Sequence, residues 1–138
     1  MNIPVETKPA LWVAVGGAVA LDRAWDAGFR PTAILAMSDA MAIGALRALR
    51  ERGLASPRDI SVVGFDDIDL APHTDPPLTT VHQPTRQKGE EAVRLLLSLS
   101  KRSETDEPVH LRLATRLVIR GSTARAPHSR QEVAAAHD

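Results

Sequence analysis

A run of β-branched and apolar residues ends in two acids at Ile60-Ser61-Val62-Val63-Gly64-Phe65-Asp66-Asp67. Such composition favours extended backbone, and a continuous apolar run of this length is typical of a strand buried on both faces of a sheet. A second run, Ala33-Ile34-Leu35-Ala36-Met37, has the same character and lies between Pro31 and Ser38-Asp39. The two runs therefore predict neighbouring central strands of a parallel sheet, each covered on both faces.

Helical patterns alternate with these strands. Residues 17–27 carry apolar side chains at helical spacing, and Gly28 follows them where a left-handed C-terminal cap belongs. Before this helix, residues 5–11 form a short extended candidate. Between the two strands, a second helix begins with Asp39 as its expected N-cap and ends at Gly53.

A third strand is expected over residues 78–82, and Pro84 opens a third helix that ends near residue 100. Residues 109–119 alternate between apolar and polar side chains, which predicts a strand, or a bent pair of strands, with one wet face. The alternation of strands and helices with short connections predicts an α/β fold, in which helices cover both faces of a doubly wound parallel sheet. Residues 1–123 form its one domain, and residues 124–138 a flexible tail.

The composition excludes several classes of function. The 138 residues carry 17 basic and 17 acidic side chains, so the formal net charge is zero. The protein therefore lacks the excess of basic side chains that is typical of a nucleic-acid binder. The absence of cysteine excludes disulfides, thiolate zinc sites and cysteine nucleophiles. The sequence contains no apolar run long enough to cross a bilayer and no signal-peptide pattern. We therefore expect a cytoplasmic location.

Polar side chains follow the three predicted strands at Ser38-Asp39, Asp66-Asp67 and His82-Gln83. Because ligands bind at the carboxyl ends of parallel strands, these side chains are expected to meet along one rim of the sheet. Asp66 could accept hydrogen bonds from a ligand while Asp67 caps the next turn, the two acids could hold magnesium, or both could simply cap the loop. Trp12 could stack on a ligand ring or cover the core.

Several segments, taken together and in order, resemble a known family. They are Pro31-Thr32-Ala33-Ile34, Ser38-Asp39, Ile43-Gly44-Ala45-Leu46, residues 59–67, Pro76-Pro77-Leu78-Thr79-Thr80-Val81, Gln83-Pro84 and Arg120-Gly121-Ser122-Thr123. This set resembles the carboxyl-terminal part of a lactose-repressor-type (LacI/GalR) bacterial transcription regulator, and the resemblance covers residues 12–123. It implies an incomplete second lobe of the periplasmic-binding-protein-like type I fold.

The resemblance also implies roles for individual residues. The effector, a sugar or nucleoside-like small molecule, would be bound by four residues: Trp12, Ser38, Asp66 and Gln83. A homodimer contact is implied for a second set: Met41, Ile43, Ala45, Leu70, His73 and Thr74. The resemblance implies no catalytic residue, no metal site and no cofactor.

The sequence lacks the family's helix-turn-helix, its first lobe and the opening strand and helix of its second lobe, so we expect a fragment. Operator DNA would then be bound only through a head that this sequence does not contain. Effector affinity should be poor, because one wall of a cleft cannot bury most of a ligand. Ala92, Val93, Leu96 and Leu97, which would pack on the first lobe, should drive self-association or a domain swap.

Two other classes of function remain open at this point. A solute-binding protein of a sugar transporter would share the fold but would carry a signal peptide upstream. An enzyme of the doubly wound class would need a complete triad, metal set or phosphate loop, which the sequence does not show.

Overall fold

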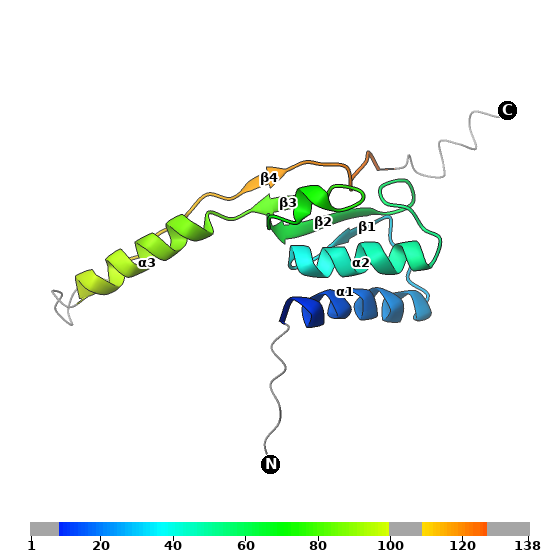
Figure 1. Ribbon diagram of the computed structural model, residues 1–138, viewed down its shortest axis with the longest axis horizontal. Helices are drawn as coiled ribbons and strands as arrows, with labels where there is room; N and C mark the ends of the chain where they lie inside the picture. The colour runs from blue at the N-terminus through cyan, green and yellow to red at the C-terminus, as the bar shows by residue number, and fades with distance from the viewer. Residues whose placement is uncertain (1–8, 100–108, 127–138) are drawn as a thin grey trace, which may run out of the picture.

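A four-stranded sheet with strand order β1-β2-β3-β4 organises the protein. The structure, a computed structural model, describes residues 9–99 and 109–126 (Figure 1). Its elements are α1 (Pro9–Asp26), β1 (Ala33–Leu35), α2 (Asp39–Glu51), β2 (Ser61–Asp66), a 3-10 turn (Ala71–His73), β3 (Thr79–His82), α3 (Thr85–Leu99) and β4 (Arg116–Val118). Strands β1, β2 and β3 run parallel, which confirms the predicted α/β fold with a mostly parallel sheet, while β4 runs antiparallel to β3.

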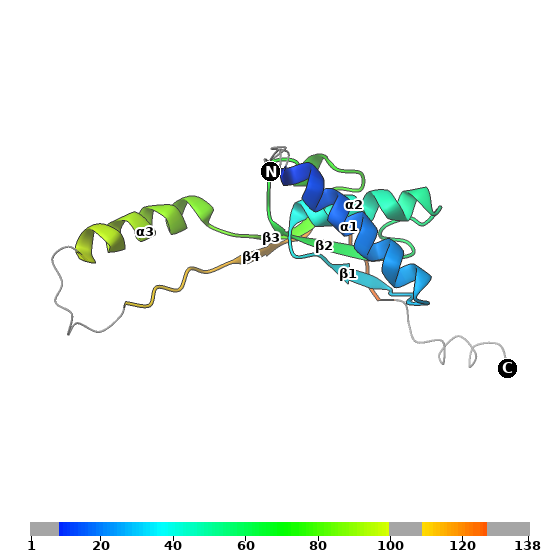
Figure 2. The same ribbon diagram turned by 90° about the horizontal axis from the view of Figure 1, so that it is seen from below.

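Helices α1 and α2 lie on the same side of the sheet. Figures 1 and 2 show α2 against the strands and α1 over α2. The two helix backbones touch where each has a glycine, because a Cβ on Gly17 would overlap the carbonyl of Met41 and a Cβ on Gly44 would overlap that of Ala14. This close approach lets α2 bury its apolar face, and Leu49 is fully buried together with Val62 and Leu78 of the sheet region.

Helix α1 begins earlier than predicted. Residues 9–11 belong to α1 rather than to an extended segment, and residues 5–8 lie outside the described part of the chain. Pro9 is the first helical residue, a position where its missing N–H costs nothing, and Ala10 and Leu11 are good helix formers. The predicted end is confirmed, because Gly28, two residues after the last helical residue Asp26, has a φ of +86°.

The prediction that β1 is buried on both faces is wrong. Leu35 keeps 74% of its surface exposed and Met37 is also exposed. The reason is that β1 is the edge strand of this sheet, because β2 is the one strand beside it among the described residues. An apolar groove of about 220 Å³ runs beside it, lined by Ile34, Leu35 and residues of α1 and α2.

The segment 109–119 forms a shorter strand than expected. Only Arg116–Val118 pairs with β3, because the residues before Arg116 lie beyond the point where β3 gives way to α3. The expected apolar face is also uncovered, since Leu111, Leu117 and Ile119 are exposed.

Helix α3 extends away from the rest of the protein (Figures 1 and 2). It begins at Thr85, so Pro84 directly precedes it. Leu96 and Leu97 are each 67% exposed and Val93 is exposed as well. The described chain leaves the apolar side of this helix open to solvent, as the resemblance led us to expect.

The segment after β4 closes the other end of the sheet. Ser122 is fully buried, and its carbonyl accepts a 2.8 Å hydrogen bond from the Val62 amide. Its hydroxyl donates to the Val62 carbonyl at 2.6 Å and accepts from the Thr79 amide at 2.8 Å. One serine therefore joins β2 to β3 at their amino ends.

Candidate functional site

Two of the expected site residues meet at the carboxyl ends of β2 and β3. The side-chain amide of Gln83 donates a 2.7 Å hydrogen bond to Oδ1 of Asp66, and both residues are half-buried. They are neighbours because Asp66 lies opposite His82 in the β2–β3 register, which places Gln83 one residue further along. A hydrogen-bonded carboxylate beside a side-chain amide offers both acceptors and donors to a polar ligand.

An unusual backbone turn aims the two acids in different directions. Asp66 has a φ of 112° and Asp67 a φ of 57°, so two consecutive residues lie in the region that favours glycine. Aspartate tolerates this region better than most residues, yet each such position costs about 1–3 kcal/mol and persists only where surrounding contacts hold it. The contacts that hold this turn come from both acids: Asp66 accepts from Gln83, and Asp67 makes the contacts described next.

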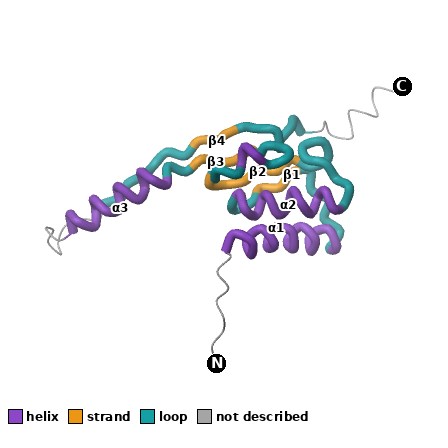
Figure 3. The backbone as a smooth tube through the Cα atoms, viewed as in Figure 1, coloured by secondary structure: helices purple, strands orange, loops and turns teal. Residues whose placement is uncertain are grey.

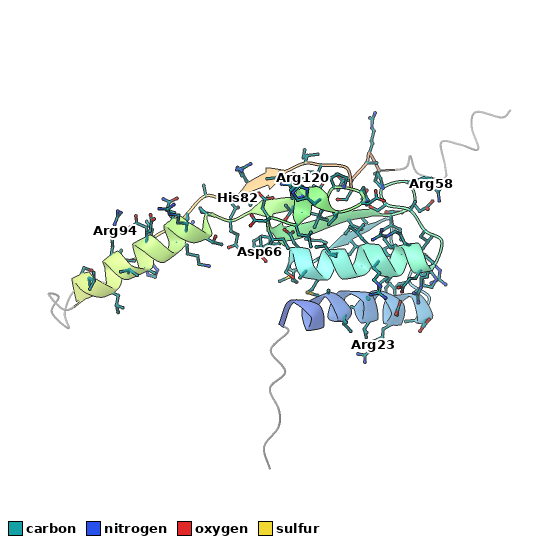
Figure 4. The ribbon with its side chains drawn as sticks, viewed as in Figure 1. Arg23, Arg58, Asp66, His82, Arg94 and Arg120 are labelled. Carbon is teal, nitrogen blue, oxygen red and sulfur yellow. The ribbon has the colours of Figure 1, made fainter. Side chains whose placement is uncertain are left out.

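Asp67 is the centre of a network that the sequence did not reveal. Its Oδ1 accepts a 2.6 Å hydrogen bond from Nη2 of Arg120, and its Oδ2 lies 3.0 Å from Nδ1 of His82. Figure 4 labels these two partners, Arg120 and His82. The Arg120 guanidinium holds the pKa of the Asp67 carboxyl below its usual range, against the opposing effect of burial and with further help from His82. Arg120 is fixed in turn, because Nη1 donates to the carbonyl of Leu78 at 2.8 Å.

The depressed pKa of Asp67 predicts a loss of stability in acid. Because the pKa is lower in the folded than in the unfolded protein, ionised Asp67 stabilises the fold at neutral pH, and this contribution is lost as pH falls from about 4 through the folded pKa. In Asp67→Asn, the free energy of unfolding should therefore fall less steeply than in the unmodified protein between about pH 5 and pH 2. Urea titrations at several pH values measure the free energy of unfolding and its slope with pH. Asp69→Asn, at an exposed loop position, is the control, and equal slopes in all three proteins would contradict the prediction.

Ser38 caps α2 in place of Asp39. The Ser38 side chain accepts a 3.3 Å hydrogen bond from the Met41 amide, and its extended backbone is that of an N-cap residue. The prediction that Asp39 caps the helix is therefore wrong by one residue. Asp39 is instead fully buried, where its carboxylate accepts hydrogen bonds from the Thr80 hydroxyl and, at 2.9 Å, from the Ile68 amide.

The other two expected effector residues are less closely tied to Asp66. Ser38 follows β1, so it lies on the side of the sheet where the parallel strands have their carboxyl ends, as Asp66 does. Within the described residues, however, no hydrogen bond links Ser38 to Asp66 or Gln83. Trp12 lies in the first turns of α1, and its side chain falls outside the described part of the protein. The roles of all four residues in binding an effector stay predictions.

The expected dimer residues fall on two elements. Met41, Ile43 and Ala45 belong to α2, and Leu70, His73 and Thr74 belong to the loop that contains the 3-10 turn. Ala45 is only 3% exposed, so it has almost no surface to offer to a partner. Leu70 and His73 are exposed, whereas the Thr74 hydroxyl is held by the carbonyls of Ala71 and Pro76 at 3.0 and 2.8 Å.

Sequence reasoning missed Arg120 and Asp39 as organising residues. Arg120 is part of the Arg120-Gly121-Ser122-Thr123 segment, but its partner lies 53 residues earlier in the chain. The arginine that ends the alternating segment and the second acid after β2 have opposite charges, and this is the signal that could have paired the two.

The fold is that of a known class of domain. A family model described as "Periplasmic binding protein-like domain" matches residues 3–123. The chain belongs to this family, and its sequence and fold are similar to those of lactose-repressor-type regulators, as the sequence motifs predicted.

Three relatives illustrate the match. The "HTH-type transcriptional regulator MalR" of Streptomyces coelicolor is 50% identical over 99 residues, which are 72% of this chain and 28% of MalR. A crystal structure of the Lac repressor dimer bound to operator and the anti-inducer ONPF is 38% identical, with a TM-score of 0.75 over 83% of this chain and 39% of that one. A CelR–cellobiose complex is 42% identical, with a TM-score of 0.72 over 79% of this chain and 33% of that one.

The match is partial on the side of the relatives. The chain spans 28% of the length of MalR and 39% of the Lac repressor chain. In the part of this chain that the structure describes, no helix is both long and apolar enough to cross a membrane.

Proposed function

We propose that this chain is part of the small-molecule-sensing domain of a lactose-repressor-type transcription regulator. Its role would be to supply one wall of an effector cleft at the carboxyl edge of the sheet. The observation that carries the proposal is the hydrogen bond of 2.7 Å between Asp66 and Gln83, which places a carboxylate and an amide side by side where ligands of parallel sheets bind.

The proposed effector is a sugar or a nucleoside-like compound. Adjacent ligand hydroxyls would donate to the Asp66 carboxylate and accept from the Gln83 amide, and the Ser38 hydroxyl and the Trp12 ring would complete the wall. The similarity to CelR, whose complex contains cellobiose, supports a carbohydrate. The relatives are transcriptional regulators, and we propose no catalytic activity for this chain.

The remaining partners follow from the same family. We propose that the protein acts in the cytoplasm and forms a homodimer through exposed parts of α2 and of the loop around Leu70 and His73. Operator DNA would be bound by a DNA-binding head of the kind that MalR and the Lac repressor possess. Effector binding would change DNA affinity by favouring one arrangement of the domain over another.

Asp66→Ala tests the proposed site. Cellobiose and adenosine, titrated separately into the isotopically labelled chain, are the probes, and chemical-shift changes are the readout because one wall should bind weakly. The probe that binds should shift the signals of Asp66 and Gln83. Asp66→Ala should lower the affinity for that probe about 10- to 150-fold, which corresponds to about 1.5–3 kcal/mol for a hydrogen bond to a charged group.

Asp69→Ala is the matched control, since it removes an exposed acid a few residues further along. Its affinity should equal that of the unmodified chain. Unchanged affinity in Asp66→Ala would remove Asp66 from the site. Saturable shifts that avoid both strand ends would place binding elsewhere and contradict the proposal.

A further inference from the structure

The sheet carries α1 and α2 on one face, and the described part of the chain leaves the other face without a helix. Two contacts with α2 mark the helical face: the Thr80 hydroxyl donates to Asp39, and a Cβ on Gly64 would overlap Oδ1 of the same carboxylate. Because side chains alternate along a strand, Val63 and Val81 lie on the opposite face. In Figures 1 and 2, α1 lies over α2 and α3 extends beyond the end of the sheet, so none of them covers that face.

This second face is apolar on all four strands. Leu35 lies opposite Val63 in the β1–β2 register and Leu117 lies opposite Val81 in the β3–β4 register, so each shares the face of its partner. Leu35 and Leu117 are both more than half exposed. Parallel sheets occur almost only with both faces covered, and a large exposed apolar surface marks a contact site. We call this surface the open face, and its residues are Leu35, Val63, Phe65, Val81 and Leu117.

The same chain carries an apolar helix surface that has no sheet beneath it. The chain leaves β3 through Gln83 and Pro84, forms α3, and returns through residues 109–115 to β4 (Figures 1 and 3). We call α3 together with residues 109–115 the arm. Its exposed apolar side chains include Val93 and Leu96 on α3, and Val109 and Leu111 on the returning segment.

The arm is held away from the open face of its own copy. Two residues separate β3 from α3, and one of them, Gln83, donates the 2.7 Å hydrogen bond to Asp66. Pro84, Lys88 and Leu111 line a common cavity of about 190 Å³, so α3 and the returning segment lie together at the base of the arm. Folding the arm back would disrupt both contacts. The open face is therefore available to an arm from another copy.

We propose that two copies of this chain form a reciprocal dimer, in which the arm of each copy packs on the open face of the other. A two-fold axis makes both contacts at once, because each copy supplies one helix and one sheet face. Each sheet would then have helices on both faces, as the α/β class requires. This surface is separate from the homodimer contact proposed for α2 and the loop around Leu70, so the inference does not rest on the proposed function.

Length and charge suit this contact. Helix α3 has 15 residues and is about 22 Å long, while β2, with six residues, is about 20 Å long, so the helix can lie along the sheet from end to end. The residues of the open face carry no charge, and the formal net charge of each copy is zero. Two copies therefore approach each other without net repulsion.

Sedimentation equilibrium of the full chain measures the dimer. Leu96→Lys in the arm and Leu117→Lys on the open face should each raise the dissociation constant about 100-fold. Two-fold symmetry places each substitution in two contacts, and each lost apolar contact should weaken association about tenfold. Val19→Lys, at an exposed position of α1, is the control and should leave the dissociation constant unchanged. Circular dichroism confirms that each variant is folded.

Mixing two variants tests whether the contact is reciprocal. Leu96→Glu keeps an intact open face and Leu117→Lys keeps an intact arm, and each should be monomeric alone. Together they should form a heterodimer, because one arm–face contact is unchanged and the other brings opposite charges together. A mixture of Leu96→Glu with Leu96→Lys has no intact arm and should stay monomeric.

Paramagnetic relaxation locates the arm on its partner. The chain has no cysteine, so Gln87→Cys on α3 accepts a spin label in a copy without isotopes, while an isotope-labelled parent copy is observed. The amide signals of Val63 and Val81 should broaden, and that of Val19 should not.

Three results would overturn the inference. The first is a monomeric parent at millimolar concentration. The second is a dimer whose broadened signals are those of Met41 and Leu70, which would support the homodimer contact of the proposed function instead. The third is an equal dissociation constant for folded Leu117→Lys and Val19→Lys.

If Leu117→Lys does not fold, Leu35→Lys at the other side of the open face replaces it. A 100-fold weakening would support the reciprocal dimer, and an unchanged dissociation constant would contradict it. A failure of cellobiose and adenosine to bind would count against the proposed function and leave all these measurements valid.

Discussion

Gly44→Ala should destabilise the protein by about 3 kcal/mol or more, near or beyond the upper end of the usual cost of overpacking. The new Cβ would overlap the carbonyl of Ala14 in α1, which is backbone and cannot turn aside as a side chain would. The two helices would have to separate, which would open the core that α2 forms with the sheet. Urea unfolding followed by circular dichroism measures the change, and Gly17→Ala should show a similar loss for the same reason.

Gly16→Ala is the matched control, because it lies beside Gly17 in α1 and a Cβ there meets nothing within 4 Å. Alanine is the better helix former, so this variant should be more stable than the parent by up to about 1 kcal/mol. The two neighbouring substitutions thus have opposite predicted signs. Equal stability of Gly16→Ala and Gly17→Ala would contradict the close packing of α1 on α2.

Asp39→Ala should also cost a large share of the stability. The Asp39 carboxylate is fully buried and accepts from the Thr80 hydroxyl and the Ile68 amide, so its removal leaves two donors without a partner. At about 1–3 kcal/mol for each unsatisfied group, the expected loss is about 2–6 kcal/mol. Urea unfolding measures the loss, and hydrogen exchange at the Ile68 amide should become faster.

Asp39→Asn separates hydrogen bonding from charge. The amide oxygen can still accept from the Ile68 amide, and the amide nitrogen can donate to the Thr80 hydroxyl, so the loss should be less than half that of alanine. Gly64 explains why the site is tight, because a Cβ there would overlap Oδ1 of Asp39. Equal losses in the alanine and asparagine variants would mean that the charge matters and the hydrogen bonds do not.

The order of the elements could be predicted because it depends on local patterns. The apolar runs that became β1 and β2, the third strand at Thr79–His82 and the cap at Gly28 each follow from a few neighbouring residues. The meeting of Asp66 with Gln83 was also predictable, since parallel strands end at a common edge.

Features that depend on distant partners could not be predicted in the same way. The run at β1 has the composition of a covered strand, but burial requires neighbours that the described chain does not provide, and Leu35 is exposed. Residues 109–115 alternate like a strand, yet no strand in residues 9–99 or 109–126 lies beside them. Arg120 reaches Asp67 only because β4 returns antiparallel to β3, a direction that no local pattern specifies.

The position of Ser122 has a consequence for how the protein is made. The Val62 amide, near the start of β2, finds its partner at a residue 60 positions later, and the Thr79 amide depends on that same serine. During translation, β2 and β3 leave the ribosome long before this partner does. The nascent sheet should therefore stay open at its amino end, within reach of chaperones, until the segment around Ser122 has emerged.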